Sequence, residues 1–445
     1  MCGIVAYIGN KQAYDIVIQG LKRLEYRGYD SAGVALLNGD MRVYKKQGKV
    51  SNLEEEVAGK DTTGTIGMGH TRWATHGEPN DKNSHPHLSE SGDLAIIHNG
   101  IIENYATLKE GMIQRGHTFH SDTDTEVLAH LIENVMENTG LPLADAVRLA
   151  LKQVVGAYAI VILSKNHPEH LIAARKGSPL VVGLGHDRGE FLFASDATPI
   201  IEYTNKVIYL KDGEVAKVQN KELIIKSIEN VVQVPYVQEL ELSLERLEKG
   251  GYPHFMLKEI YEQPRSIFDS FRGRFDSNTG QIHMRSMEDY AERLKEIKRL
   301  ILIGCGTSWH AGLVAEYLFE DLARVPVEVE YASEFRYRNP VLYADDLVVA
   351  ISQSGETADS LAAMDLAKRK GASVFGVCNV VGSSIPRLSD AGAYTHAGPE
   401  IGVASTKAFT AQVTVLALMA VGMAKLRGTM NMVAIKSFFE ELEGI

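Results

Sequence analysis

The chain has 445 residues, of which 45% are apolar and 23% are charged, and its formal net charge is −11 at pH 7. This length predicts two or three domains of a soluble globular protein, because it exceeds what one compact core normally holds. The negative charge argues against nucleic acid and membrane surfaces as partners, since both need basic patches, so an anionic ligand must be held by local amides, hydroxyls and a few cations.

The number of cysteines and the apolar segments indicate the cellular compartment of the protein. Cys2, Cys305 and Cys378 are odd in number and widely spaced, which argues against a disulfide framework and indicates a reducing environment. The N-terminus lacks the basic start and apolar run of a signal peptide. The most apolar segment, residues 409–425, contains a glutamine and a threonine, so we interpret it as a buried helix. These features predict a cytoplasmic protein.

The first part of the chain is rich in short apolar or β-branched runs separated by glycine and Asx turns, a pattern typical of strands. The expected strands cover residues 2–9, 32–38, 94–100, 157–164, 179–185, 191–195 and 206–218. Residues 11–28 and 123–140 carry apolar side chains at three- and four-residue spacing and are predicted helices. Grouped strands with helices around them indicate a layered α+β domain over residues 2–220.

Residues 221–289 carry no strong strand run and are predicted to form a connector with helices. From residue 290 to 435, strand and helix patterns alternate, which predicts a parallel sheet with right-handed crossovers. The expected strands of this α/β domain cover residues 299–306, 325–333, 345–355, 371–379 and 391–398.

Cys2 is a candidate nucleophile, because it follows Met1 directly and is small enough to be exposed when Met1 is removed. The freed α-amino group would have a pKa of about 8 and could serve as general base toward the thiol. The alternative is a cysteine that only packs at the start of a strand. Asn99 and Gly100 follow an apolar strand and offer an amide and a backbone N–H to an oxyanion, although such a pair is also a common turn.

An amino-acid substrate also needs partners for its carboxylate and its ammonium group. Arg72 can hold a carboxylate with two parallel hydrogen bonds, and Thr75 and His76 are close to it in sequence. Asp122 or Asp124 could bind the ammonium group. The alternatives are a surface ion pair for the arginine and a helix N-cap for the acidic segment.

No cofactor and no metal ion are expected. His85 and His87 lie close together, but no clustered acid or cysteine completes a ligand set. The glycine-rich segment after residue 303 does not have dinucleotide-binding spacing, because Trp309 stands where the third glycine should be. A Walker lysine is also missing from the sequence.

Six motifs occur in the order seen in class II glutamine amidotransferases, and residues 2–220 resemble the glutaminase domain of that family. The motifs are "CGI", "RLEYRGYDSAG", "HTRWATHG", "NSHPH", "HNGIIEN" and "DTDTE". The resemblance implies an N-terminal-nucleophile hydrolase fold, an αββα sandwich, in which Cys2 attacks the side-chain amide of glutamine and releases ammonia. It also implies Asn99 and Gly100 in the oxyanion hole, Arg72 on the substrate carboxylate and Asp124 on its ammonium group.

Three hydroxyl-rich turns, at residues 304–308, 352–357 and 400–410, each lead from a strand region toward a helix. Their amides and hydroxyls suit a monophosphate at the carboxyl edge of a parallel sheet. Ordinary helix N-caps are the alternative for any one of them. The turns resemble the sugar-isomerase (SIS) module of the glutamine:fructose-6-phosphate amidotransferase family, as does "KGGYPHFMLKEIYEQP" in the connector.

This second resemblance implies fructose 6-phosphate as the acceptor, a homodimer in the full-length family, and Trp73 as a gate to an ammonia channel. The residues implied around the sugar phosphate are Cys305, Gly306, Thr307, Ser308, Ser352, Gln353, Ser354, Thr357, Val403 and Ser405.

Members of this family continue past the position of Ile445 through a second sugar-isomerase module and a C-terminal tail. From the sequence we therefore expect glutamine hydrolysis by this chain, but weak or absent synthesis of glucosamine 6-phosphate. Two alternatives stay open, namely a glutaminase that supplies another sugar phosphate and a non-enzymatic sugar-phosphate sensor.

Overall fold

The computed structural model describes residues 2–25, 28–73, 77–187, 189–240 and 248–445. The chain divides into two compact units, residues 1–244 and residues 245–445. Each unit has its own sheets and its own hydrophobic core, and each is described by itself.

The first unit contains two antiparallel sheets within the described residues. Strands in the first sheet follow the order β14 (Gln238–Glu239), β11 (Lys206–Tyr209), β9 (Val181–Leu184), β10 (Phe191–Ala194), β1 (Gly3–Ile8), β4 (Ile66–Arg72), β2 (Ser31–Asn38) and β3 (Asp40–Gln47). The second sheet has the order β13 (Glu222–Ser227), β12 (Glu214–Gln219), β8 (Leu171–Lys176), β7 (Gly156–Ser164), β6 (Leu94–Ile102) and β5 (His87–Leu88).

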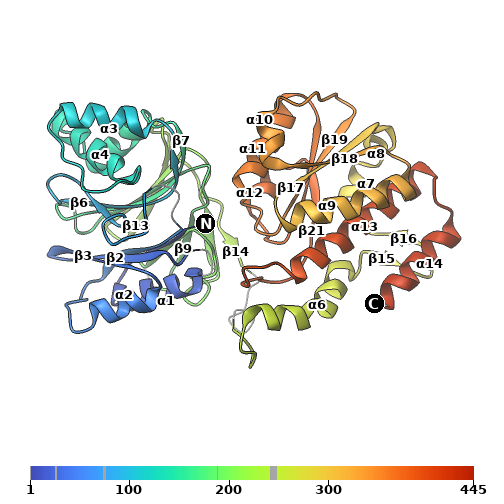
Figure 1. Ribbon diagram of the computed structural model, residues 1–445, viewed down its shortest axis with the longest axis horizontal. Helices are drawn as coiled ribbons and strands as arrows, with labels where there is room; N and C mark the ends of the chain where they lie inside the picture. Colours follow the sequence, from blue (N-terminus) through green and yellow to red (C-terminus); the bar gives the residue numbers. More distant parts are fainter. Residues whose placement is uncertain (1, 26–27, 74–76, 188, 241–247) are drawn as a thin grey trace. The chain divides into compact units, whose positions relative to one another are not determined.

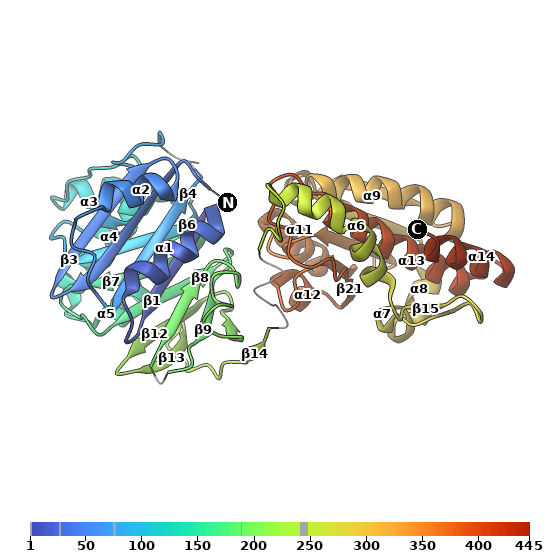
Figure 2. The same ribbon diagram turned by 90° about the horizontal axis from the view of Figure 1, so that it is seen from below.

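The two sheets pack face to face, with helices on both outer faces, as Figure 1 shows. Helices α1 (Ala13–Leu24) and α2 (Val50–Val57) cover the first sheet, and Figure 2 shows them lying across it. Helices α3 (Tyr105–Gln114), α4 (Thr125–Thr139) and α5 (Leu143–Leu151) cover the second. The four layers confirm the predicted αββα sandwich.

Strand β1 shows why these strands are apolar on both faces. Ile4, Ala6 and Ile8 point into the core between the two sheets, while Val5 and Tyr7 face α1. A strand with helix on one side and sheet on the other has no solvated face, so it shows no polar alternation.

The second unit is built around a parallel sheet with the order β18 (Val327–Tyr331), β17 (Arg299–Gly304), β19 (Asp346–Ser352), β20 (Ser373–Cys378) and β21 (Ala391–Tyr394). All neighbouring pairs are parallel, which confirms the predicted α/β fold and its strands. One face carries α10 (Ala332–Tyr337), α11 (Ala358–Arg369) and α12 (Ser384–Leu388). The opposite face carries α9 (Thr307–Leu318) and α13 (Lys407–Arg427) (Figure 1).

The remaining elements of this unit lie around that three-layer core. They are α6 (Phe255–Phe271), the hairpin β15 (Phe275–Asp276) and β16 (Gln281–Ile282), α7 (Arg285–Asp289), α8 (Ala291–Glu296), the π-helix η3 (Phe319–Ala323) and α14 (Met432–Glu443). Helix α13 is long and apolar enough to cross a membrane, but most of its side chains are buried in this core. The interpretation of residues 409–425 as a buried helix is thus confirmed.

The strand order creates a switch point in the parallel sheet. From β17 the chain passes to β18 on one side, and then returns to β19 on the other side of β17. The carboxyl ends of β17 and β19 therefore flank the crevice where open α/β sheets bind ligands. The turns at residues 304–308 and 352–357 follow these two strands directly.

The structure contains strands that the sequence did not predict, among them β3, β4 and β8. Strand β13 is another, because it pairs with β12 although no strong strand run was found in residues 221–289. Leu223, Ile224 and Ile225 supply the β-branched and apolar character, but the run is short and flanked by charges. Its register follows from the two-residue turn Asn220–Lys221, where both residues have positive φ.

Burial between the two sheets of the first unit predicts a difference between two leucines. Leu163 on β7 is 0% exposed in the inter-sheet core, whereas Leu149 on α5 is 39% exposed. Leu163→Ala should lower the free energy of unfolding by about 2–5 kcal/mol through lost contacts and a cavity. Leu149→Ala should change it by about 1 kcal/mol or less. Chemical denaturation followed by circular dichroism measures both, and equal losses would contradict this packing.

Candidate active site

Cys2 lies where β1 begins, beside the end of β4. Gly3 is opposite Thr71 in the antiparallel pair, so the thiol reaches the chain that leaves β4. Trp73 N donates to Cys2 Sγ at 3.2 Å, and the thiol is 3.5 Å from Trp73 O. Burial raises the pKa of the Cys2 thiol, although the Trp73 amide and nearby positive charges oppose the rise. The thiol is therefore protonated at neutral pH and needs a base to become a nucleophile.

Asn99 reaches Cys2 from the other sheet. It lies on β6, and its Nδ2 donates to Cys2 O at 3.0 Å. Its Oδ1 accepts a hydrogen bond from His70 Nε2 at 2.9 Å, and His70 lies on β4 of the first sheet. One side-chain amide thus bridges the sandwich and has its NH2 group beside the thiol-bearing residue.

His70 fixes the orientation of that amide. Its Nε2 faces Asn99 Oδ1 and also the carbonyl oxygen of His98 at 3.1 Å, so it must carry the hydrogen. Burial lowers the pKa of His70 to about 3, which keeps the imidazole neutral at physiological pH. A flipped Asn99 would place two donors against each other, so Nδ2 must face Cys2.

Gly100 occupies a position that excludes larger residues. Its φ is +136°, and an added Cβ would lie 2.1 Å from the carbonyl oxygen of Ala157 on β7. A glycine here allows β6 to stay paired with β7 while Asn99, the preceding residue of β6, lies beside Cys2.

Arg72 and Asp124 supply opposite charges near this site. Arg72 ends β4 and is buried, and its guanidinium donates to the carbonyl oxygens of Gly77 and Glu78 at 3.3 and 3.4 Å. Burial lowers the pKa of Arg72, while nearby acidic groups, Asp124 among them, oppose this. A buried guanidinium with a carboxylate close by suits a ligand that carries both a carboxylate and an ammonium group.

The carboxylate of Asp124 does not serve as a helix cap. Asp124 stands at the N-cap position of α4 but makes no side-chain cap hydrogen bond, and its Oδ2 accepts from Ile102 N at 2.8 Å. Asp122 is exposed and lies near Lys82 and Asn83. Of the two acids considered, Asp124 is therefore the one held inside, at the end of β6.

The other residues expected at this site are placed as follows. Trp73 is 46% exposed and packs edge-to-face on Tyr29, with ring centroids 5.5 Å apart. Thr75 and His76 lie outside the described residues. His85 and His87 are buried against hydroxyls near the start of α4, at Thr125 Oγ1 and Thr123 Oγ1 respectively.

His70 is the residue that the sequence analysis missed. It lies two residues before Arg72 on β4, so both side chains project from the same face of the strand. This two-residue spacing from Arg72 was the only sequence signal that His70 faces the site. The hydrogen-bond partner of His70, Asn99, is 29 residues further along the chain, and only the fold brings the two side chains together.

In the second unit, the turn after β17 exposes the N-terminus of α9. Gly306, with φ +58°, occupies the N-cap position, where it offers no side chain to the first amides of the helix. Ser308 Oγ accepts a hydrogen bond from Gln412 Nε2 of α13 at 3.1 Å, so α9 and α13 are joined there. Cys305 and Thr307 lie in the same turn, where Cys305 is partly exposed and Thr307 is exposed.

The turn after β19 is shaped by its own hydroxyls. Ser352 Oγ accepts from Gly355 N and lies 3.0 Å from Thr357 Oγ1, while Ser354 Oγ accepts from Glu356 N. Thr357 is the N-cap residue of α11 and makes no side-chain cap hydrogen bond. The hydroxyls of this turn therefore do not act as an ordinary N-cap, and the first amides of α11 lie at the switch point beside those of α9. Gln353 O accepts from Asn379 N and joins this turn to the end of β20.

The third turn is arranged differently. The Glu400 carboxylate accepts from Thr406 N and Ala408 N at 2.8 and 3.1 Å, so an internal acid caps α13. Ser405 Oγ donates to the same carboxylate at 2.8 Å. Val403 is 81% exposed, away from the core. Of the three turns, those after β17 and β19 lie together at the switch point, whereas this one is closed by Glu400.

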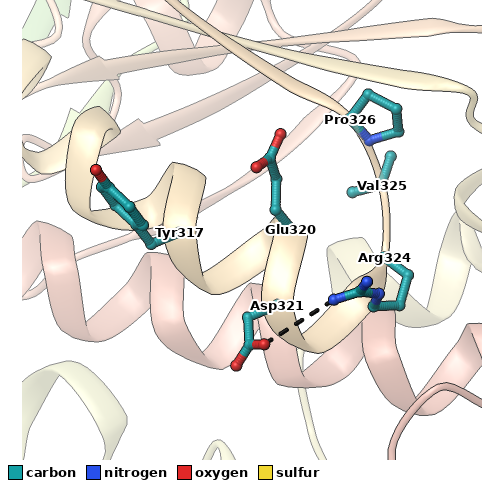
Figure 3. Close-up of a pocket in the computed structure, with 6 residues that line it drawn as sticks. All are labelled: Tyr317, Glu320, Asp321, Arg324, Val325 and Pro326. Carbon is teal, nitrogen blue, oxygen red and sulfur yellow. Dashed lines mark ion pairs between the residues drawn. The ribbon is translucent and has the colours of Figure 1, made fainter.

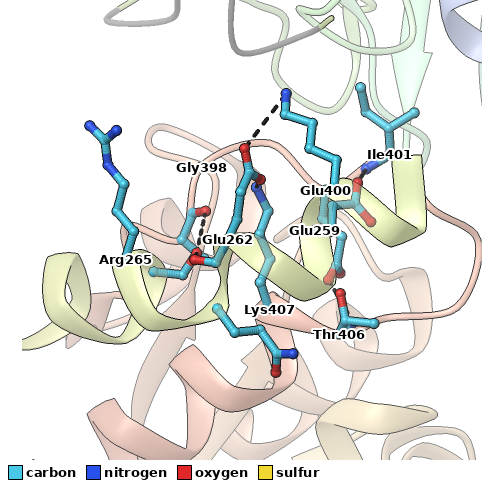
Figure 4. A network of polar contacts seen from close by, with 12 residues as sticks. Glu259, Glu262, Arg265, Gly398, Glu400, Ile401, Thr406 and Lys407 are labelled. Atoms are coloured by element: carbon cyan, nitrogen blue, oxygen red, sulfur yellow. Dashed lines mark hydrogen bonds and ion pairs between the residues drawn. The ribbon is translucent and has the colours of Figure 1, made fainter. Parts of the chain in front are cut away.

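Helix α6 fixes the position of this third turn, as Figure 4 shows. Glu259 accepts from the amides of Ile401 and Gly402, and Lys407 Nζ donates to Glu262 Oε2 at 2.6 Å. Burial raises the pKa of Glu259, although the two backbone hydrogen bonds oppose the rise. The connector thus contributes the buried Glu259 and the partly exposed Glu262, which hold residues 401–407.

A hollow of about 470 Å³ lies elsewhere in this unit (Figure 3). It is lined by Tyr317, Glu320, Asp321, Arg324, Val325 and Pro326. Pro326 directly precedes β18, so the hollow is at the amino edge of the sheet, opposite the switch point. Its acidic lining does not suit a phosphate.

Comparison with known proteins identifies both units. Residues 56–242 match the glutamine amidotransferase domain family, and residues 293–422 match the SIS domain family. A glutamine–fructose-6-phosphate aminotransferase (isomerizing) from Bacteroides thetaiotaomicron is 58% identical over 448 residues, covering 100% of this chain and 73% of that protein. The protein of the same name from Chlorobaculum tepidum is 58% identical over 446 residues, covering 99% of this chain and 72% of that one.

Among solved structures, a C-terminal domain of glucosamine-fructose-6-phosphate aminotransferase from Francisella tularensis is 42% identical to the matched part. The match covers 44% of this chain and 55% of that one, with a TM-score of 0.42.

The contacts of Glu259 predict how the third turn responds to its loss. Glu259→Ala removes the acceptor of two backbone amides. Because unmade buried hydrogen bonds cost about 1–3 kcal/mol, hydrogen exchange at the amides of Ile401 and Gly402 should accelerate about tenfold or more. Arg265→Ala on the same helix is the control, since Arg265 is exposed and pairs with Asp269. Exchange followed by mass spectrometry on residues 400–406 measures this, and equal rates in both variants would contradict the assigned role.

Proposed function

The chain belongs to the glutamine–fructose-6-phosphate aminotransferase (isomerizing) family, and on that basis we propose that it hydrolyses glutamine and delivers the ammonia to fructose 6-phosphate, giving glucosamine 6-phosphate. The observation that carries the first half is the placement of Cys2 beside Asn99 Nδ2, whose orientation His70 sets. This arrangement supports a thiol nucleophile with a ready donor for an oxyanion.

The proposed chemistry begins when removal of Met1 frees the α-amino group of Cys2. That amine takes the thiol proton, and Sγ attacks the side-chain carbonyl carbon of glutamine. Asn99 Nδ2 and the Gly100 N–H stabilise the tetrahedral oxyanion. The amine returns the proton to the leaving nitrogen, ammonia departs, and water hydrolyses the γ-glutamyl thioester to glutamate and free thiol.

Arg72 and Asp124 hold the far end of glutamine in this proposal. The buried guanidinium takes the α-carboxylate and the carboxylate takes the α-ammonium group, with Thr75 and His76 as further predicted contacts. Because these charges act at the end of the substrate that does not react, they position the amide carbon without touching it.

In the second unit, we assign the phosphate of fructose 6-phosphate to the switch point between β17 and β19. The first amides of α9 and α11 offer donors and the positive ends of two helix dipoles, which suits a dianion in a protein of net charge −11. Hydroxyls of the two turns add donors. The residues proposed around the sugar phosphate are Cys305, Gly306, Thr307, Ser308, Ser352, Gln353, Ser354, Thr357, Val403 and Ser405.

Other expectations stay predictions. They are the division at residues 220 and 289, the homodimer, the gate role of Trp73 and the lack of nucleic-acid and membrane partners. A cytoplasmic location is supported by Cys2, Cys305 and Cys378, all of which are free thiols in the structure.

Two measurements separate this proposal from its rivals. A non-enzymatic sensor would bind phosphosugar, yet release no ammonia from glutamine. A glutaminase that serves another sugar would release ammonia, but fructose 6-phosphate would not change the rate. Assaying ammonia, glutamate and glucosamine 6-phosphate with and without fructose 6-phosphate covers both cases, and formation of glucosamine 6-phosphate would support the proposal over both rivals.

Replacing the nucleophile gives the first functional prediction. Cys2→Ala should lower glutamine hydrolysis by roughly 10⁴-fold or more, because the remaining oxyanion donors cannot supply a thioester route. Cys378→Ala, at a buried cysteine of β20, is the matched control and should leave the rate within about a factor of two. Mass spectrometry of the N-terminus should show that the active protein lacks Met1. Unchanged ammonia release by Cys2→Ala would exclude the proposed nucleophile.

A second prediction concerns His70 as a positioning residue. His70→Phe removes the hydrogen bond to Asn99 Oδ1, so kcat for glutamine hydrolysis should fall by about 10²–10³-fold while KM changes little. His70→Gln keeps an N–H donor and should restore part of kcat. Because the pKa of His70 is about 3, the wild-type pH profile between pH 5 and 9 should contain no limb from this group. A merely structural role would instead lower the thermal stability of both variants and leave kcat of the folded fraction unchanged.

A further inference from the structure

Three side chains that the glutaminase chemistry does not use gather in the first unit. Glu90 lies between β5 and β6, His117 lies between α3 and α4, and His130 is on the second turn of α4. One carboxylate oxygen and one nitrogen from each ring lie within 4.8 Å of one another. We propose that Glu90, His117 and His130 bind a divalent first-row transition metal ion, with zinc as the first choice.

The spacing of the three atoms fits such an ion. Nδ1 of His117 is 3.1 Å from Nδ1 of His130, and Oε2 of Glu90 is 3.8 Å from the same nitrogen. Zinc bonds of about 2.0–2.1 Å at the tetrahedral angle place neighbouring ligand atoms about 3.3 Å apart. The two separations lie on either side of this value, so small side-chain shifts complete the geometry. Three protein ligands leave a fourth position for water.

A buried carboxylate stands behind one of the imidazoles. Nε2 of His130 is 3.7 Å from Oε1 of Glu126, and both side chains are almost fully buried. The other contacts of the Glu126 carboxylate fix its position, because it accepts hydrogen bonds from the amides of His120 and Ser121 and from Ser121 Oγ. A carboxylate beside the second nitrogen is the arrangement that orients a metal-bound imidazole and raises its basicity.

The hydrogen positions follow from this contact. Glu126 favours a hydrogen on Nε2 of His130, so the lone pair on Nδ1 points toward His117, which then donates from its own Nδ1. When a metal ion binds, that proton moves to Nε2 of His117, and both imidazoles stay neutral. The Phe119 ring, with its centroid 4.6 Å from that of His130, restricts rotation of the buried imidazole.

Backbone contacts hold the third ligand in place. Oε2 of Glu90 accepts from the amide of Thr118, next to His117, and the amide of Glu90 donates to Oε2 of Glu133 on α4. The turn before β6 and the segment before α4 are therefore already connected to the helix that carries His130. A bound ion would cross-link the same three segments, so it should stabilise the folded chain.

A second group of the same residue types provides a control. His167, Glu169 and His170 also lie close together, but burial and the positive charge of Lys217 lower the pKa of His170. A neighbouring lysine disfavours a cation there. His167→Gln is therefore expected to leave metal binding intact.

The test is calorimetric titration of the full chain with zinc chloride, made in the Cys2→Ser background so that the Cys2 thiolate does not take the ion. We expect one zinc ion per chain and a rise in melting temperature with zinc. Glu90→Gln, at an exposed position, and His117→Gln should each abolish or strongly weaken binding. Glu126→Gln should weaken it about 10- to 100-fold, as for other residues that orient a ligand.

Absence of saturable zinc binding in the Cys2→Ser chain would overturn the proposal. Equal binding by His117→Gln and its parent would overturn it as well, and loss only in His167→Gln would assign the ion to the second group instead. Because binding is measured directly, the result does not depend on whether the chain hydrolyses glutamine.

Discussion

The proposed glutaminase site depends on one hydrogen-bonded chain that crosses between two sheets, from His70 through Asn99 to Cys2. His70 lies on β4 of the first sheet and Cys2 directly precedes the neighbouring strand β1, while Asn99 projects from the second sheet. The geometry of the site is therefore set by how the sandwich closes, and the inter-sheet core holds that distance constant. A site built on two packed sheets is more rigid than one built on loops. Oxyanion stabilisation requires this rigidity, because the donors must be in place before charge develops.

In the second unit, the donors proposed to bind an anion are also held in place by the fold, but they are backbone amides. At the switch point the amides of α9 and α11 are presented by turns that their own hydroxyls and Gly306 shape. The third turn, in contrast, is closed by Glu400, whose carboxylate occupies the amides at the start of α13. A phosphate that used these last amides would have to displace an internal carboxylate, so the first two turns are the better anion site.

Much of this arrangement could be predicted from the sequence, because it rests on local patterns. Apolar runs predicted the strands of the parallel sheet and most strands of the first unit, although β3, β4 and β8 were missed. Short motifs indicated Cys2, Asn99 and Arg72. The role of His70 could not be predicted, since it depends on register between sheets rather than on neighbours in the chain. Glu400 was missed for a related reason: its carboxylate reaches amides six and eight residues further on.

The distribution of charge explains how one site can both bind and react. Burial raises the pKa of the Cys2 thiol and lowers that of His70, so the groups at the reacting end are uncharged before reaction. In the proposed mechanism, Arg72 and Asp124 bind the two ionised groups of the amino-acid substrate at its other end. If His70 were cationic, it would stabilise the thiolate before attack as well as the tetrahedral oxyanion. The free-energy barrier between these two states would then be lowered only slightly. A neutral donor chain instead favours the state in which negative charge has moved to the substrate oxygen.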